Sequence, residues 1–317
     1  MGLRVRISSS MLAAPQLLPV DQTAQLEALP KSIHSAHKPQ GWWYLGVLAF
    51  LVGWLYLPII GRLAVQWWHD PNFSHGFFVP AFAGFVLWQD RERISKLTVK
   101  PSWWGLPVIL VGLMMLVLGD LGAELFVSRT SLLVLIAGLV TFLLGWNYLY
   151  AVLFPLAFLI LMIPIPAIVF NQITFPLQLF ASKIASIILP LCGVPVLREG
   201  NVIGLPLMQL EVAEACSGIR SLMSLTTLAV IYGYLTESRI WMRVVLAVAS
   251  LPIAVATNSL RIVGTGLLVQ YWDPDKAEGF FHLFSGWLIF VMSLMMLFLF
   301  HYLMRRFMPA EMPGAEK

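Results

Sequence analysis

Eight apolar stretches, each near the length of one membrane crossing, constrain the fold of this chain more than any other feature. They lie at about residues 42–60, 74–89, 103–119, 130–146, 148–166, 217–236, 241–260 and 283–304, and the second is the shortest. A helix needs about 20 apolar residues to cross a bilayer. Because only 11% of the 317 residues are charged, against roughly 25% in soluble domains, little is left for a soluble domain. The sequence predicts an all-α polytopic membrane protein with about eight transmembrane helices.

Basic residues lie at alternate ends of these stretches, which predicts their orientation. They are Lys31, Lys38, Arg91, Arg93, Lys96, Lys100, Arg239, Arg243, Arg305 and Arg306. Lysine and arginine are enriched in cytoplasmic loops, and all ten fall on one side if the count is eight. We therefore expect a loosely ordered cytoplasmic tail at 1–40, a transmembrane domain at 41–306 and a cytoplasmic C-terminal tail at 307–317.

Two segments do not fit the crossing pattern. Residues 168–191 mix Asn, Gln, Ser and Lys with Phe, Leu and Ile at nearly helical spacing, and a ninth crossing there would move the later basic residues outside. An amphipathic helix lying on the outer membrane surface is the better prediction. Residues 195–214 alternate apolar and polar side chains around Glu199-Gly200-Asn201, which predicts a short extracytoplasmic hairpin.

Three reactive side chains fall at the outer ends of different stretches. Cys216 begins the sixth stretch, Arg261 ends the seventh and His282 begins the eighth. The 20 or so residues before Arg261 rise roughly 30 Å, the thickness of the hydrocarbon layer. Ionisable groups at membrane depth cost on the order of 2.5 kcal/mol or more unless they pair or face water. The sequence therefore predicts a functional cluster at the outer face.

A thiol, an imidazole and a guanidinium can together carry out acyl transfer. A helix N-terminus and nearby cations favour the Cys216 thiolate, whereas the preceding acidic residues oppose it unless they point away. His282 could move a proton, and Arg261 could stabilise an oxyanion or hold a substrate carboxylate. The supporting or substrate-binding candidates are Asn258, Arg220, Glu214 and His75.

Plainer interpretations stand beside this one. A lone cysteine is usually a small buried hydrophobe, as we expect for Cys192, and a terminal arginine is often an anchor. A polytopic transporter, or a scaffold for exopolysaccharide export, would also carry polar groups in apolar spans, but we find no internal repeat. The sequence shows no phosphate-binding loop, no metal-ligand spacing and no nucleic-acid signal, so we expect no cofactor, metal or nucleic-acid partner.

The chain closely resembles the exosortase family of the exosortase and archaeosortase group. The resemblance is carried, in order, by Phe73-Ser74-His75-Gly76 with Val79-Pro80 and Trp88, by Pro195 with Arg198-Glu199-Gly200 and Ile203, by Glu211-Val212 with Ala215-Cys216-Ser217-Gly218-Ile219-Arg220, by Asn258-Ser259-Leu260-Arg261-Ile262, and by His282 with Gly286. These pieces span about residues 45–305, and their order and spacing make the match specific.

The resemblance implies Cys216 as nucleophile, His282 as the proton-transfer residue and Arg261 as the third catalytic member. It implies a cysteine protease or transpeptidase of the cell inner membrane, with its active site on the periplasmic side. Its partners would be secreted proteins with a C-terminal PEP-CTERM signal, which is a Pro-Glu-Pro-like motif, a hydrophobic span and a basic tail. Because the chain stops soon after Arg306, we expect a single-domain subtype.

Overall fold

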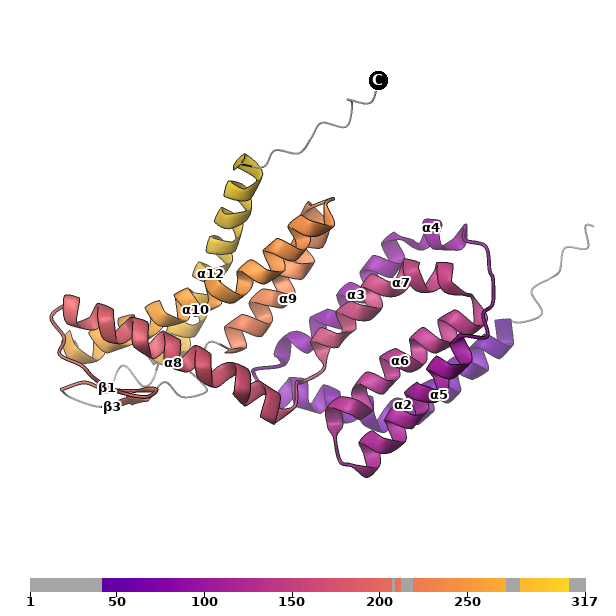
Figure 1. The fold of residues 1–317 in the computed structure, drawn as a ribbon, viewed down its shortest axis with the longest axis horizontal. Coiled ribbons are helices and arrows are strands. Elements are labelled where there is room, and N and C mark those ends of the chain that lie inside the picture. Colours follow the sequence, from indigo (N-terminus) through magenta and orange to yellow (C-terminus); the bar gives the residue numbers. More distant parts are fainter. Residues whose placement is uncertain (1–41, 207–208, 212–218, 272–279, 308–317) are drawn as a thin grey trace, which may run out of the picture. The chain divides into compact units, whose positions relative to one another are not determined.

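The computed structural model describes residues 42–206, 209–211, 219–271 and 280–307, and most of them are helical (Figure 1). The predicted tails at 1–40 and 307–317 lie outside these ranges except for Phe307. The chain divides into two compact units after Leu55, and all packing described below belongs to the second. The helices are α2 (Trp42–His69), η1 (Ser74–Phe77), α3 (Phe78–Gln89), α4 (Arg91–Ser95), α5 (Gly105–Leu121), α6 (Leu125–Leu143), α7 (Trp146–Phe158), η2 (Leu159–Met162), α8 (Ala167–Leu191), α9 (Ile219–Thr236), α10 (Ile240–Tyr271) and α12 (Phe280–Phe307).

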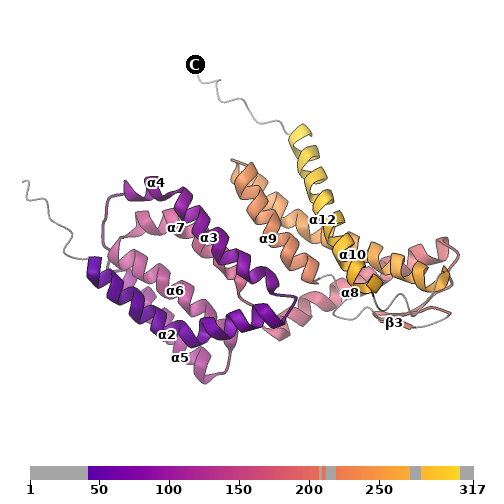
Figure 2. The same cartoon turned by 180° about the vertical axis from the view of Figure 1, so that it is seen from behind.

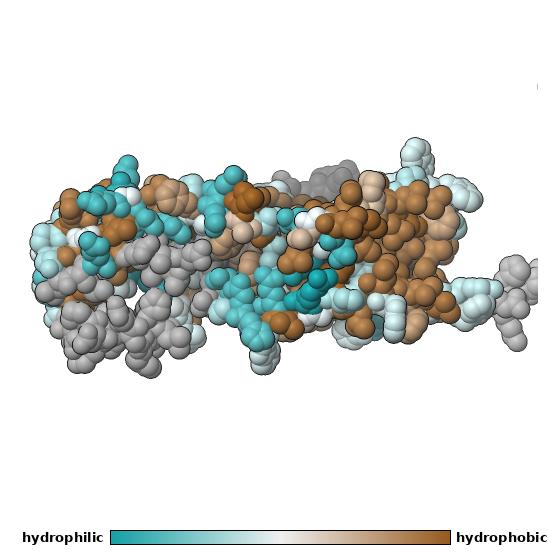
Figure 3. Space-filling view, turned by 90° about the horizontal axis from the view of Figure 1, so that it is seen from below, coloured by the Kyte–Doolittle hydropathy of each residue, from teal (hydrophilic) through white to brown (hydrophobic). Residues whose placement is uncertain are grey.

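The predicted all-α membrane fold is confirmed. Five helices are long and apolar enough to cross a membrane, namely Trp43–His69, Leu125–Leu143, Ala167–Leu191, Ile240–Tyr271 and Gly286–Phe307. Three shorter apolar helices accompany them, Gly105–Leu121, Trp146–Met162 and Ser221–Thr236. Many large apolar side chains on these helices are exposed, and Figure 3 shows broad brown areas on the face that it draws. Helix length alone does not determine how many helices cross the membrane, so the expected count of eight stays a prediction.

Several helices differ in length from their apolar stretches, and two of the differences are informative. The stretch at 74–89 forms the short η1 and then α3, a helix of 12 residues that rises only about 18 Å. Helix α10 does not end at Arg261, as hydropathy predicted, but continues to Tyr271. The added turns persist because Ile262, Val263 and Val269 are buried against other elements of the chain.

Helices α5 and α6 pack backbone to backbone, because glycines recur every seven residues along α5. Gly105, Gly112 and Gly119 are all buried. A Cβ atom at Gly112 would lie 2.9 Å from the Leu135 backbone nitrogen, and one at Gly119 would lie 2.5 Å from that of Ser128. Small residues allow this close approach in membrane helix pairs. The pair is therefore held in one register, which fixes the first turns of α6.

Residues 167–191, expected as a surface helix, form the continuous helix α8. Its buried face is small or polar, with Thr174, Gln178, Ser182 and Ala185, whereas its exposed face is mostly apolar and also carries Asn171, Gln172 and Lys183. An apolar outer face suits contact with lipid. Its length and composition also suffice for a crossing, so its position on the outer surface stays a prediction.

The 195–214 region forms three short antiparallel strands, one more than a hairpin has. They are β1 (Leu197–Glu199), β2 (Val202–Gly204) and β3 (Gln209–Glu211), and β2 lies between the other two. The turn between β1 and β2 uses Gly200 at a φ of 64°, a conformation that glycine adopts without strain. Ser182 of α8 donates a hydrogen bond of 3.0 Å to the Gly200 carbonyl.

One hydrophobic cluster joins α8, the sheet and the end of α10. It contains Leu189 of α8, Ile203 of β2 and Ile262 of α10, all nearly fully buried. Seen from behind in Figure 2, α8, α10 and β3 gather in one part of the fold. The sheet leads through residues 212–218, outside the described ranges, into α9.

Candidate active site

Helices α9, α10 and α12 form an antiparallel bundle whose register is set by polar contacts between helices. Thr226 of α9 lies 2.8 Å from Ser250 of α10, hydroxyl to hydroxyl. Thr257 of α10 lies 2.7 Å from Ser293 of α12 in the same way. Buried hydroxyl pairs of this kind satisfy polar groups that would otherwise cost free energy in an apolar interior.

The register brings the start of α9 level with the middle of α10. Gly233 of α9 packs beside Arg243 of α10, and Thr226 contacts Ser250, so seven residues along one helix match seven along the other. Because both helices rise equally per residue, seven more residues bring Ile219 level with Thr257. Residues 212–218, which carry Cys216 and Glu214, precede α9 in the chain and lie outside the described ranges.

Arg261 lies one turn further along α10, beside the start of α12. It is half-buried, and its Nη2 atom lies 3.8 Å from the position of a Cβ atom on Gly286. Gly286 follows His282 by one helical turn on α12. The guanidinium therefore contacts the first turns of the helix that carries the histidine.

Asn258 lies one turn before Arg261 on α10 and is 3% exposed. Residues three apart on a helix share a face, so Asn258 and Arg261 both belong to the part of α10 that meets α9 and α12. The structure thus brings together two of the predicted residues, together with the backbone of the helix turn that bears His282. The side chains of Cys216, Glu214, Arg220 and His282 lie outside the described part of the chain.

His75 has a structural setting instead. It is 7% exposed, and its Nε2 atom lies 3.2 Å from the Leu161 carbonyl of η2. Nearby, Trp67 of α2 donates a hydrogen bond of 2.9 Å to the Met162 carbonyl, and Gly76 packs directly against the Trp67 ring. These contacts tie η1 to α2 and η2. A role for His75 in binding substrate stays a prediction.

The sequence analysis missed two buried polar groups. Glu237 accepts a hydrogen bond of 2.6 Å from His301, whose other ring nitrogen lies 2.7 Å from the Tyr232 hydroxyl. Arg129 of α6 is 4% exposed. The fourth apolar stretch was taken to begin at residue 130, one residue too late to include Arg129, although helix α6 begins at Leu125.

Comparison with known proteins decides the family. A sequence model of the transmembrane exosortase family matches residues 67–299, most of the chain and all three predicted catalytic positions. The chain belongs to the transmembrane exosortase family. No curated protein and no solved structure matches the chain. Exosortase membership identifies a membrane protein-sorting enzyme in general terms, and the bundle of α9, α10 and α12 lies largely within the matched residues.

Proposed function

We propose that the chain is a membrane-embedded cysteine protease or transpeptidase that cleaves the C-terminal PEP-CTERM signals of secreted proteins. The observation that carries this proposal is the contact of Arg261 with the first turns of α12, inside the exosortase match. It brings a permanently charged guanidinium to the helix turn that bears His282. The register of α9 and α10 supports a place for the Cys216 segment at the same level.

In the proposed reaction, the Cys216 thiolate attacks the carbonyl carbon of the scissile peptide bond. Arg261 stabilises the oxyanion that forms, because its N–H donors suit developing negative charge. The C–N bond then breaks, His282 gives a proton to the leaving amine, and a thioester remains on Cys216. Water or another amine attacks this thioester and regenerates the thiol.

The proposed site lies on the periplasmic side of the inner membrane, with the N-terminus in the cytoplasm. A sorting motif just outside its own membrane span would meet the enzyme at that surface. The proposed domain boundaries, with a transmembrane domain at 41–306 and an outer region at 168–214, follow from the same orientation. The partners are thus the lipid bilayer and tailed secreted proteins.

The test is processing of a co-expressed secreted protein that ends in such a signal. We expect Cys216→Ala to leave the substrate at full length while the enzyme still inserts, as judged by immunoblots of both proteins in membranes. Cys192→Ala is the matched control, because Cys192 is exposed at the end of α8, and it should process normally. A thioester-linked fragment trapped on Cys216 would identify the nucleophile directly.

Full processing by Cys216→Ala would contradict the assignment of the nucleophile. The alternative, a transporter or a scaffold of exopolysaccharide export, predicts export that survives loss of this thiol. The two outcomes are separated by measuring processing and polysaccharide export in the same cells.

A further inference from the structure

Arg129 is a buried charge without a partner in the described part of the chain. It is 4% exposed, and none of the hydrogen bonds or ion pairs between described residues involves it. An arginine stays charged in proteins. Its guanidinium nitrogens are not among the fully buried unpaired atoms of the described residues, so the charge reaches a pocket surface, where an anion could pair with it.

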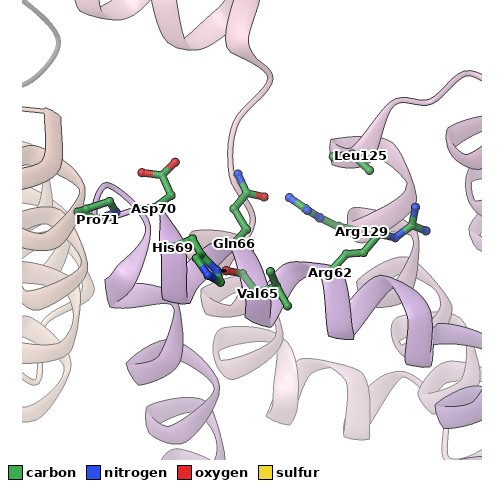
Figure 4. Close-up of a pocket in the computed structure, with 8 residues that line it drawn as sticks. All are labelled: Arg62, Val65, Gln66, His69, Asp70, Pro71, Leu125 and Arg129. Atoms are coloured by element: carbon green, nitrogen blue, oxygen red, sulfur yellow. Dashed lines mark hydrogen bonds between the residues drawn. The ribbon is translucent and has the colours of Figure 1, made fainter.

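The guanidinium projects into a pocket between α2 and α6. The pocket has a volume of about 450 Å³ and is lined by Arg62, Gln66 and His69 of α2, by Asp70 and by Leu125 and Arg129 of α6. In Figure 4 the Arg129 guanidinium extends toward the Gln66 amide, whereas Arg62 turns its guanidinium away. An anion in this pocket would meet the donors of Arg129 and Gln66 together.

The acidic side chains nearby are already engaged. Asp70 accepts a hydrogen bond of 2.9 Å from the Asn72 backbone nitrogen, and Glu124 accepts one of 3.4 Å from that of Phe126. Asp120 lies 3.9 Å from the exposed Arg62. Asp70 and Glu124 also line the cavities that contain Arg129, but among the described residues no carboxylate forms an ion pair with Arg129, so its guanidinium donors stay available to a ligand.

A second cavity of about 430 Å³ shares Arg129 and Gln66 with the first and extends to Pro164, Pro166 and Phe170. The two cavities adjoin at Gln66, Asp70 and Arg129, and together they form a groove lined by amide, proline and aromatic side chains, by the Asp70 and Glu124 carboxylates and by the Arg129 guanidinium. A lipid headgroup would need only the compact pocket around Arg129. An extended peptide with an acidic side chain would use both parts.

The helix turn that carries Arg129 is fixed by its neighbours. The Tyr56 hydroxyl of α2 lies 2.9 Å from the Ser131 hydroxyl of α6, and Ser131 donates a hydrogen bond of 2.6 Å to the Ser128 carbonyl. The close α5 contact at Gly119 supports the same turn. The backbone position of Arg129 is therefore fixed before a ligand binds, which lowers the entropic cost of binding.

We propose that Arg129 binds a carboxylate carried by an extended peptide, and that this peptide is the acidic motif of the sorting signal. The identity of the peptide rests on the proposed function. The groove then acts as a specificity subsite for the residues next to the substrate's membrane span. In the predicted orientation it opens at the outer membrane surface, the side on which the proposed catalytic residues lie.

Binding can be measured without catalysis, in full-length Cys216→Ala protein held in phosphatidylcholine nanodiscs. Two fluorescent synthetic signal peptides are compared, identical except for Glu or Gln in the motif. We expect the Glu peptide to bind roughly tenfold more tightly, the usual worth of one charge-assisted hydrogen-bonded contact. Adding Arg129→Gln should remove this preference, and adding Arg93→Gln, an exposed arginine on α4, should retain it.

An equal affinity for both peptides would overturn the proposal, and that comparison needs no Arg129 variant to fold. A second outcome would assign the pocket to a lipid headgroup instead. In that case phosphatidylglycerol would remove the Glu preference, and Arg129→Gln would abolish lipid binding but leave the affinities of both peptides unchanged. Failure of the proposed nucleophile appears separately, as processing by Cys216→Ala in cells, and it would not change the Glu and Gln affinities.

Discussion

At the scale of single residues, Arg261 is the proposed catalytic residue whose contact with α12 the structure describes. Its Nη2 atom lies 3.8 Å from the position of a Cβ atom added to Gly286, which is an ordinary van der Waals distance. We expect Gly286→Ala to retain processing, whereas Gly286→Leu should displace the guanidinium and impair it. The initial rate of substrate processing in membranes, normalised to the amount of folded enzyme, tests both variants.

Arg261→Lys complements this pair. A lysine keeps the charge but loses the planar set of donors, so we expect processing to fall roughly 10- to 100-fold, the cost of one or two charge-assisted hydrogen bonds. Unchanged processing would show that Arg261 only anchors the helix. Arg306→Lys at the far end of α12 is the control substitution and should process at the normal rate.

The sequence identified candidate residues through their chemistry and their place at the ends of apolar stretches. That reasoning found Arg261, whose contact with the start of α12 supports its predicted neighbourhood, while its catalytic role stays a prediction. It missed Arg129 because an apolar stretch defined by hydropathy stops at the first charged residue, so Arg129 was left outside the fourth stretch. Burial of a charge depends on which helices pack around it, and in this chain that packing is set by glycines on another helix.

At the scale of helices, the glycine face of α5 gives the sharpest prediction. A Cβ atom at Gly119 would lie 2.5 Å from the Ser128 backbone nitrogen, so Gly119→Ala must push α5 and α6 apart. Overpacking of this kind typically costs 1–3 kcal/mol. Gly84→Ala on α3 is the control, because nothing lies within 4 Å of its added Cβ atom.

The measurement is thermal unfolding of purified protein in detergent. Gly119→Ala should lower the midpoint and also weaken any Arg129-dependent preference for an acidic peptide, because Ser128 precedes Arg129. A melting temperature equal to that of Gly84→Ala would refute the close packing of α5 and α6.

The buried Tyr232, His301 and Glu237 network joins α9 and its following turn to α12, far from the proposed site. Arg305 adds a contact of 3.4 Å to Glu237. Removing one partner of a buried hydrogen bond leaves the other group unsatisfied at a cost of about 1–3 kcal/mol, so Glu237→Leu should destabilise the fold. We expect less folded protein with unchanged processing per folded molecule, whereas Glu92→Leu on the exposed α4 should change neither quantity.

Helix ends were the least predictable property of the elements. Gly264 and Gly266 each lower helix propensity by about 1 kcal/mol, and the apolar stretch was taken to end at residue 260. Helix α10 nevertheless continues, because it packs closely against α8. A Cβ atom at Gly266 would lie 3.0 Å from the Leu189 side chain. Such tertiary contacts are not visible in local sequence.

At the scale of the whole molecule, the membrane-helix class followed from hydropathy alone, because exposing so many apolar residues to water is unfavourable. The family followed from the order of several short motifs, and the matching family model confirms it. The sidedness of α8 depends on the count of crossings. Basic residues predict that count, but the packing of helices does not determine it.

The two arrangements of α8 differ in where its ends lie. A helix on the outer surface keeps both ends outside, whereas a crossing helix puts them on opposite sides of the membrane. Exposed reporters exist at each end, Asn171 and the native Cys192. In a Cys216→Ala background, a membrane-impermeant maleimide applied to spheroplasts should therefore label Cys192 and, in a separate Cys192→Ala variant, Asn171→Cys.

Lys96→Cys, placed in the predicted cytoplasmic loop after α4 and free of native cysteines, should be labelled only after the membrane is permeabilised. If only one end of α8 reacts in sealed spheroplasts, α8 crosses the membrane and every later loop changes side. Arg239 and Arg305 would then face outward, against the distribution of basic residues. The bundle end that carries Arg261 would face the cytoplasm, where a sorting motif outside its substrate's span could not reach it.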